Sequence, residues 1–193
     1  MANIAMNLTA PALEAVFARH TWLALPEVAV ETGTFRGERT ELFARYFHTV
    51  HTVELSPVLH GAASARLAPL GTRVQCHFGD SAVVVPRLAA EIQEPVLWYL
   101  DAHWFSLNRG KSRAGYARDA EAQIARGPLP LWAELEAIGA RTYADVVLVD
   151  DARDFGRSEP TPEWEEVTLA RIASYFPGCV EALVMGDQAV VFR

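Results

Sequence analysis

The chain has 193 residues, of which 51% are hydrophobic and 21% charged, and its formal net charge is −7 at pH 7. This length and apolar content suit one domain with a single large core rather than several domains. The acidic balance argues against a nucleic-acid-binding protein, whose surface normally gathers positive charge, so we expect a small molecule or a protein as partner.

The predicted elements of the first half alternate between strands and helices, which is typical of a parallel sheet covered by helices. The pattern predicts a helix over 10–20, a strand over 27–33, a helix over 37–47, a strand over 48–56 and a helix over 56–68. It continues with a strand over 72–80 and a helix over 81–92 that Pro86 disturbs.

The second half predicts strands over 95–103 and 144–151, separated by a polar segment, 105–128, and a helix over 131–140. A helix over 163–176 follows. Two apolar runs within 179–193, joined at Gly186 and Asp187, predict an antiparallel hairpin. Together the elements predict one doubly wound α/β domain over 1–193, with a mostly parallel sheet and an antiparallel strand at its end.

The cysteines and the N-terminus are typical of a cytoplasmic protein. Cys76 and Cys179 lack the spacing of a metal site or a disulfide framework, and we expect buried thiols. The N-terminus lacks the basic start and unbroken apolar stretch of a signal peptide, because Asn7 and Glu14 interrupt it. No stretch approaches the roughly 18 to 20 apolar residues of a membrane span. We therefore expect a cytoplasmic protein without membrane contacts; the sequence leaves open a homo-oligomer.

The first strand-to-helix turn, "VETGTFRG" at 30–37, lies where open parallel sheets bind ligands. Gly33 and Gly37 let a ligand approach the backbone, and the helix behind them offers unpaired amide donors. The spacing matches neither the dinucleotide fingerprint nor the phosphate loop, and the only lysine is Lys111. Glu31 would repel a pyrophosphate and attract a cationic ligand, which favours an amino-acid-bearing nucleoside.

The next two strand ends also carry polar residues. Glu54 ends the second strand about 20 residues after the turn, where a carboxylate can accept hydrogen bonds from ribose hydroxyls. "GDSA" at 79–82 closes the third strand and is placed to face a base. Each residue has a structural alternative, since Glu31 and Glu54 can be exposed strand ends and Asp80 or Ser81 a helix cap. Their recurrence at three successive strand ends favours the ligand interpretation.

The ordered motifs "VETGTFRG", "VELS", "GDSA", "LDAH" and "VLVDD", followed by the hairpin, resemble a class I S-adenosylmethionine-dependent methyltransferase. More narrowly, they resemble the metal-dependent sugar O-methyltransferases of macrolide and aminocoumarin antibiotic tailoring, and more distantly catechol O-methyltransferase. The resemblance covers residues 25–193 and rests on short motifs. It implies a Rossmann-like fold with a seven-stranded sheet, helices on both faces and S-adenosylmethionine as cofactor.

The resemblance also implies a cofactor site at the ends of the first strands. Glu31 and Gly33 are expected near the methionine part, Glu54 at the ribose, and Asp80 and Ser81 by the adenine. The expected cofactor-binding residues are Glu31, Thr32, Gly33, Thr34, Gly37, Glu54, Leu55, Gly79, Asp80, Ser81 and Asp101.

Carboxylates end the fourth and fifth strands, at Asp101 and at Asp150 with Asp151. In neighbouring parallel strands, roughly 4.8 Å apart, they would converge, and like charges so close need a proton or a cation between them. Oxygen-only ligands suit Mg²⁺, which can lower the pKa of an acceptor hydroxyl and orient it. In the resembled sugar methyltransferases, aspartates at the positions of Asp101, Asp150 and Asp151 hold the metal. The alternative is that these aspartates bond local turns and amides.

His103 stands two residues after Asp101, where the resembled enzymes carry an acidic general base. Imidazole titrates near neutrality and can accept a hydroxyl proton, so His103 and Asp101 are the expected catalytic residues. The alternative is that His103 packs beside Trp104. The segment 105–128 holds five of the 17 basic residues and only two acids. We expect it to form a lid or substrate-binding insertion, with a solvated loop as the alternative.

The sequence therefore predicts a methyltransferase that moves a methyl group from S-adenosylmethionine to a small-molecule hydroxyl with the help of Mg²⁺. Three alternatives remain. One is a metal-independent methyltransferase with another acceptor atom, and another is a non-catalytic S-adenosylmethionine-binding protein of the same fold. The third is a dinucleotide-dependent oxidoreductase, against which the glycine spacing argues.

Overall fold

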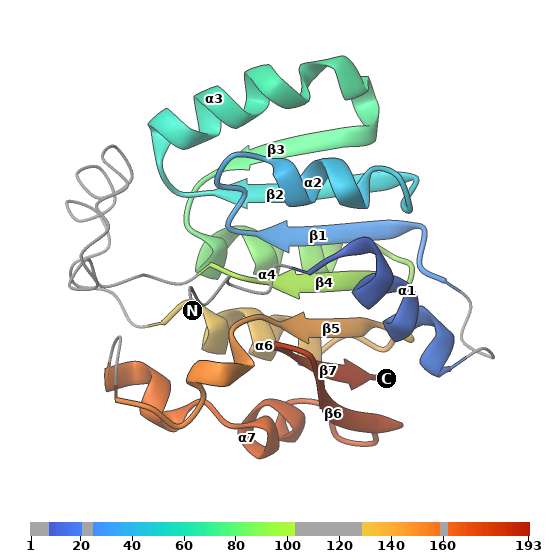
Figure 1. Ribbon diagram of the computed structural model, residues 1–193, viewed down its shortest axis with the longest axis vertical. Helices are drawn as coiled ribbons and strands as arrows, with labels where there is room; N and C mark the ends of the chain where they lie inside the picture. The colour runs from blue at the N-terminus through green and yellow to red at the C-terminus, as the bar shows by residue number, and fades with distance from the viewer. Residues whose placement is uncertain (1–7, 21–24, 103–128, 159–161) are drawn as a thin grey trace.

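The computed structural model describes residues 8–20, 25–102, 129–158 and 162–193. Its centre is a seven-stranded sheet with the order β3-β2-β1-β4-β5-β7-β6 (Figure 1). His103 and the segment 105–128 lie outside the described residues. The strands are β1 (Val28–Thr32), β2 (Thr49–Glu54), β3 (Val74–Phe78), β4 (Val96–Leu100), β5 (Val146–Val149), β6 (Glu181–Met185) and β7 (Gln188–Phe192).

The strand directions confirm the predicted doubly wound sheet. Strands β1 to β5 pair in parallel, whereas β7 lies antiparallel to both β5 and β6. The chain leaves β1 toward β2 and β3 on one side, and then returns through β4 to build the other side. The switch point, where such sheets bind ligands, therefore lies between the carboxyl ends of β1 and β4.

Helices cover both faces of the sheet, as the sequence predicts. In Figure 1, α1 and α2 lie on the near face, and α4 and α6 on the far face. Successive strand residues point to opposite faces, so Val28 and Val30 join the core under α4, α6 and α7, while Ala29 joins the core under α1 and α2. The helices are α1 (Ala10–Arg19), α2 (Glu38–Phe43), α3 (Pro57–Leu67), α4 (Ser81–Glu91), α6 (Leu131–Gly139) and α7 (Leu169–Ser174).

The expected helix over 163–176 is interrupted. A 3₁₀ turn, η4 (Pro162–Glu166), precedes α7. Between them Thr168 is extended, with φ −138° and ψ 154°, and its hydroxyl accepts a hydrogen bond from the Arg171 amide at 3.1 Å. This side chain caps a new helix instead of continuing the old one. The shorter 3₁₀ turns η1 (Ala68–Arg73) and η3 (Ala152–Asp154) join other elements.

A buried arginine on the far face connects the segment after α6 to the end of α4. Arg141, just after α6, donates to the Asp145 carboxylate at 2.7 Å and to the Ala89 carbonyl at 2.7 Å. It also donates to the carbonyls of Ile92 and Glu94, each at 2.6 Å. The arginine therefore donates hydrogen bonds to carbonyls at the end of α4, and its charge compensates that of a fully buried aspartate.

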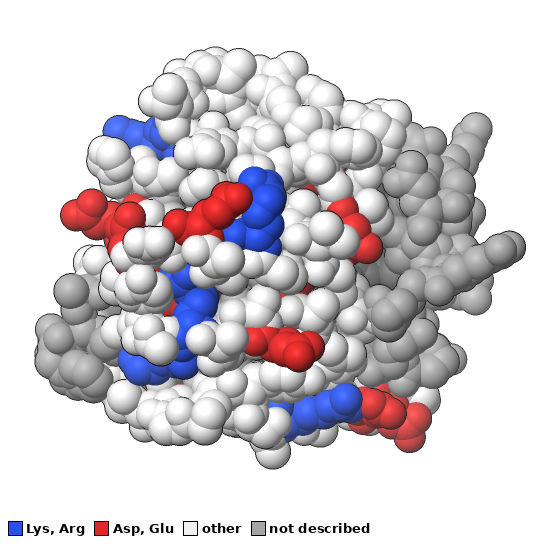
Figure 2. Space-filling model, turned by 180° about the vertical axis from the view of Figure 1, so that it is seen from behind, with Lys and Arg blue, Asp and Glu red and all other residues white. Residues whose placement is uncertain are grey.

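The far face also shows how charge is distributed outside the core. Acidic and basic side chains there lie interspersed among uncharged ones (Figure 2). Among the described residues, no helix combines the length and apolar character that crossing a membrane requires.

Candidate functional site

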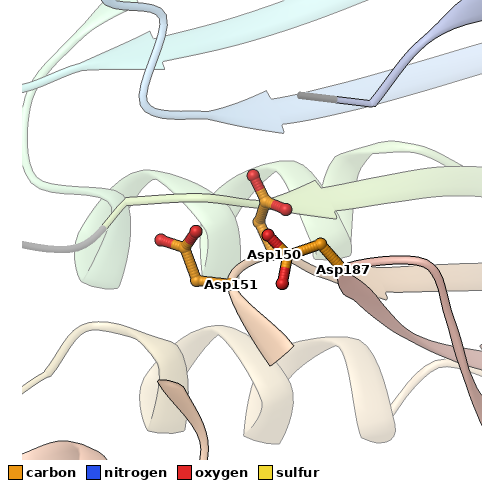
Figure 3. A group of neighbouring side chains, drawn as sticks. All are labelled: Asp150, Asp151 and Asp187. Atoms are coloured by element: carbon orange, nitrogen blue, oxygen red, sulfur yellow. The ribbon is translucent and has the colours of Figure 1, made fainter. Parts of the chain in front are cut away.

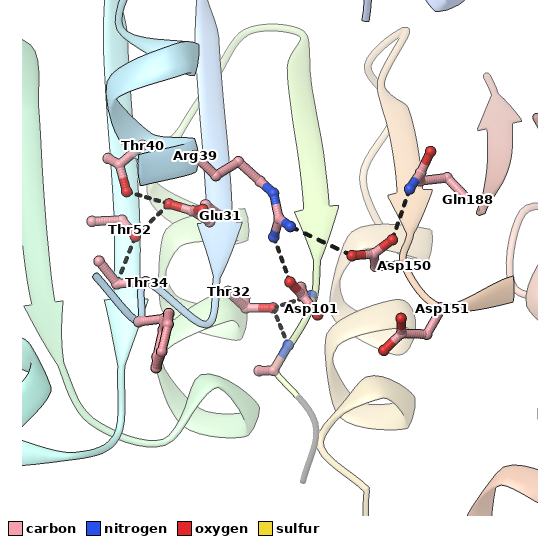
Figure 4. A network of polar contacts seen from close by, with 12 residues as sticks. Glu31, Thr32, Thr34, Arg39, Thr40, Thr52, Asp101, Asp150, Asp151 and Gln188 are labelled. Carbon is pink, nitrogen blue, oxygen red and sulfur yellow. Dashed lines mark hydrogen bonds and ion pairs between the residues drawn. The ribbon is translucent and has the colours of Figure 1, made fainter. Parts of the chain in front are cut away.

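The parallel strands bring the predicted polar residues to one edge of the sheet. Glu31 and Thr32 end β1, Glu54 ends β2, Asp101 follows β4, and Asp150 follows β5. Alternation places Glu31, Asp101 and Asp150 on the face covered by α2, where they lie in one polar network (Figure 4).

Glu31 is completely buried beneath α2 rather than exposed at the strand end. Its Oε2 atom accepts hydrogen bonds from the hydroxyls of Thr40 at 2.5 Å and Thr52 at 2.8 Å. The hydroxyl oxygens of Thr34 and Thr52 lie 2.6 Å apart. The Oε1 atom is buried without a hydrogen-bond partner among the described residues. Burial raises the pKa of Glu31 to about 7, against the lowering effect of Arg39.

The two glycines of the first turn are explained by packing within the protein. Gly33 has φ +83°, and a Cβ atom there would lie 2.7 Å from the Asp101 carbonyl oxygen. Gly37 has φ +80°, and its Cβ atom would lie 3.1 Å from the Leu67 side chain. A side chain at either position would be strained even with no ligand bound. The glycines therefore allow the turn to pack closely but do not by themselves indicate a ligand.

Glu54 holds the β1–α2 turn against the end of β2. Its carboxylate accepts the backbone amides of Phe35 at 2.8 Å and Ser56 at 2.9 Å. Phe35 is a non-glycine residue at φ 51°, in the left-handed region that such residues rarely adopt. Burial raises the pKa of Glu54. Each carboxylate oxygen has two lone pairs, so accepting one amide leaves capacity for a further donor.

The third strand end shows a helix cap. The Asp80 carboxylate accepts the Ala82 amide at 2.9 Å at the start of α4, and the Gly79 amide donates to the Glu54 carbonyl at 3.0 Å. The alternative in which Asp80 is a helix cap is therefore confirmed. Ser81 is buried beside it. Contacts of Gly79, Asp80, Ser81 and the neighbouring Leu55 with an adenosine stay predictions.

Thr32 fixes the start of the segment that carries Asp101. Its hydroxyl accepts the amides of Asp101 and Ala102, each at 3.2 Å. The Asp150 amide donates to the Leu100 carbonyl at 3.1 Å, which continues the pairing of β4 with β5. The backbone that carries both carboxylates is therefore hydrogen-bonded to neighbouring strand ends at the switch point.

Arg39 supplies the positive charge between these carboxylates, and the sequence analysis missed it. One guanidinium nitrogen bonds the Asp101 carboxylate, and another lies 3.5 Å from Asp150 (Figure 4). The guanidinium carbon lies 4.2 Å from the centre of the Tyr99 ring. A signal for this role exists in the sequence, since Arg39 precedes the buried Phe43 by one helical turn and so shares its inward face.

A second group of carboxylates lies beside this network. Oxygen atoms of Asp150, Asp151 and Asp187 all lie within 4.8 Å of one another (Figure 3). Asp151 is left-handed at φ 59°, and Asp187 comes from the β6–β7 turn. Arg153 forms ion pairs with both Asp151 and Asp187. Among the described residues, Asp187 thus completes the group of three in place of the expected Asp101.

The carboxylates influence one another as closely spaced acids should. Burial raises the pKa of Asp150, and the nearby charge of Asp101 raises it further, while Arg39 opposes both effects. The Oδ1 atom of Asp150, which is not the oxygen nearest Arg39, accepts a hydrogen bond from the side-chain amide of Gln188 at 2.7 Å. Asp150 is therefore shared between the arginine-bridged pair and the carboxylate group.

Comparisons with known proteins agree on the fold. An O-methyltransferase from Bacillus cereus in complex with SAH superposes with a TM-score of 0.57 at 17% identity, covering 95% of this chain and 89% of that one. The O-methyltransferase TomG from Streptomyces achromogenes, involved in tomaymycin synthesis and solved with SAM, gives 0.56 at 20% identity, covering 96% and 80%. The methyltransferase domain of bacterial CtHen1-CN gives 0.55 at 14% identity, covering 94% and 95%.

The sequence comparisons add no family assignment. No protein-family model matches the chain, and no curated protein sequence matches it significantly. At these identities the structural likeness establishes the Rossmann-like fold that the resemblance implied.

Proposed function

We propose that this chain is an S-adenosylmethionine-dependent methyltransferase that methylates a hydroxyl group of a small molecule. The observation that carries the proposal is Glu54, buried at the end of β2 and held by two backbone amides next to the switch point. Two proteins that share the fold, TomG and the Bacillus cereus enzyme, were solved with SAM or SAH, which supports a nucleoside ligand here.

The residues at this edge fit such a cofactor. Glu54 retains acceptor capacity for ribose hydroxyls, because its two oxygens have about four lone-pair sites, more than the amides of Phe35 and Ser56 use. Glu54, Asp101 and Asp150 place three carboxylates at this edge and Arg39 only one positive charge, which favours a positively charged ligand. When bound, the cofactor supplies an electrophilic methyl group on sulfur. The protein contributes mainly position and alignment, with the Asp101 backbone hydrogen-bonded to Thr32 at the strand end.

A divalent cation would suit the group of Asp150, Asp151 and Asp187. All three offer carboxylate oxygens, the ligands that Mg²⁺ prefers. The Arg153 side chain, which pairs with two of them, is 36% exposed and can turn toward solvent. A bound Mg²⁺ would supply Lewis-acid activation of the acceptor hydroxyl. The wider predicted set, in which Asp101 is a ligand and His103 the base, stays a prediction.

A second function is favoured by one specific observation. Because Arg39 already provides a positive charge between Asp101 and Asp150, the carboxylates need no metal to coexist. A metal-independent methyltransferase with another acceptor atom is therefore the alternative. A non-catalytic binding protein would share the cofactor site but transfer no methyl group.

Calorimetric titration with S-adenosylhomocysteine, with and without Mg²⁺, tests the proposal. We expect binding, and we expect Glu54→Gln to weaken it at least about tenfold, since hydrogen bonds to a charged group contribute about 1.5 to 3 kcal/mol. Glu38→Gln is the matched control, because Glu38 is an exposed acid in the first turn of α2.

The outcomes separate the parts of the proposal. Absence of binding in both conditions would refute the cofactor assignment. Binding that is indifferent to Mg²⁺, together with methyl transfer that survives chelation, would favour the metal-independent alternative. Screening sugar and phenolic hydroxyls for methylation would identify the acceptor.

A further inference from the structure

Within the described residues, a protein side chain supplies a positive charge to the carboxylates of Asp101 and Asp150. Arg39 enters from α2 and contacts carboxylates that follow two neighbouring strands. Its side chain is 14% exposed, and those of Asp101 and Asp150 are 18% and 7% exposed. A partly buried ion pair is screened much less than a surface pair. Removing one partner would leave an uncompensated charge.

The arginine is held in this place by contacts other than its ion pairs. Its guanidinium stacks over the ring of Tyr99, the residue two positions before Asp101 on the same face of β4. Neighbouring Thr40 is bonded to Glu31, which fixes the first turn of α2 above the sheet. Arg39 therefore cannot leave as readily as Arg153, whose side chain is 36% exposed.

The two arginines thus divide the carboxylates into two groups of different character. Arg39 holds Asp101, and the more exposed Arg153 pairs with Asp151 and Asp187. Among the described residues, the carboxylate group suited to a cation includes Asp150 but not Asp101.

We propose that Arg39 is a positioning residue that takes the place of a divalent cation at Asp101, so that Asp101 is oriented by the guanidinium and is not a metal ligand. This inference goes beyond methyl transfer and does not require it. Replacing Arg39 with an uncharged side chain would remove its positive charge from the carboxylates of Asp101 and Asp150, and these carboxylates would then attract a cation in its place.

Titration of the cofactor-free full chain with Mn²⁺, followed by calorimetry and by electron paramagnetic resonance, tests this directly. We expect the double variant Arg39→Met/Asp101→Asn, which removes one positive and one negative charge together, to leave the Mn²⁺ affinity of the wild-type chain unchanged. We expect Arg39→Met to tighten Mn²⁺ binding at least about tenfold, because loss of an adjacent positive charge shifts such equilibria by one or more powers of ten. Adding Asp101→Asn to Arg39→Met should abolish that gain.

Matched variants separate positioning from general stability. Arg66→Met removes an arginine that pairs with Glu38 and Glu41 on the outside of α2, and it should not tighten Mn²⁺ binding. Arg39→Lys keeps the charge and should preserve the wild-type affinity.

Two results would overturn the inference. One is weaker Mn²⁺ binding by the double variant Arg39→Met/Asp101→Asn than by the wild-type chain, which would make Asp101 a ligand. The other is Mn²⁺ binding by Arg39→Met no tighter than by Arg66→Met. If Arg39→Met does not fold, the charge-balanced double variant Arg39→Met/Asp101→Asn and Arg39→Lys still decide. Neither readout depends on S-adenosylhomocysteine, so failure here is distinct from failure of the cofactor assignment.

Discussion

Replacing Glu31 by glutamine should change how the stability of the fold depends on pH. Glu31 is fully buried, and burial raises its pKa from 4.5 to about 7. Below pH 4.5 the carboxyl group is protonated in both the folded and the unfolded chain. Between pH 4.5 and about 7 the unfolded chain has lost this proton while the folded chain keeps it, so stability falls as pH rises.

The size of the effect follows from the same two values. A rise of the Glu31 pKa from 4.5 to about 7 means that folding disfavours the ionised carboxylate, relative to the protonated form, by about 3 kcal/mol. Most of this difference, about 2 kcal/mol, develops between roughly pH 5 and roughly pH 8. Glutamine cannot ionise, so the free energy of unfolding of Glu31→Gln relative to wild type should increase by that amount over this range.

Urea unfolding at several pH values measures the effect as the difference between variant and wild type. Taking the difference removes the contributions of other buried acids, such as Glu54 and Asp150, which titrate in both proteins. Glu136→Gln, at an exposed position on α6, is the matched control. A difference between Glu31→Gln and wild type that stays constant within about 0.5 kcal/mol would refute the reasoning.

Three further predictions concern stability. Arg141→Met should reduce the free energy of unfolding, measured by urea titration, by about 3 to 5 kcal/mol, because it leaves the buried charge of Asp145 uncompensated. Its control is Arg87→Met, which removes an exposed ion pair and should change the free energy of unfolding by less than about 1 kcal/mol. Gly33→Ala should lower it by about 2 kcal/mol or more, since the new Cβ atom would meet the Asp101 carbonyl at 2.7 Å. Gly61→Ala, where nothing lies within 4 Å, should instead stabilise α3 by about 0.5 to 1 kcal/mol. Equal effects of the two alanines in thermal unfolding would contradict the packing explanation for Gly33.

The candidate site shows where sequence patterns suffice. In parallel strands every carboxyl end reaches the same edge, so Glu31, Glu54, Asp101 and Asp150 could be placed together from strand order alone. Asp187 could not, because its approach depends on how the C-terminal hairpin pairs with β5. A contact between residues so far apart in sequence leaves no local pattern.

Arg39 illustrates the same limit at short range. Its helix and its inward face follow from the spacing to Phe43, but its partners depend on where α2 lies over β1, β4 and β5. The sequence predicts a proton or a cation between Asp101 and Asp150, and in the structure the positive charge there belongs to an arginine.

Alternation of apolar runs and helical patterns determined the doubly wound sheet, its antiparallel closing strand and the edge that carries the acids, because strand and helix periods are local properties of the chain. Tertiary structure alone decided how deeply Glu31 is buried, which cation stands at Asp101, and which third carboxylate joins Asp150 and Asp151. These are consequences of packing between distant segments, and packing sets both the desolvation and the partner of each charge.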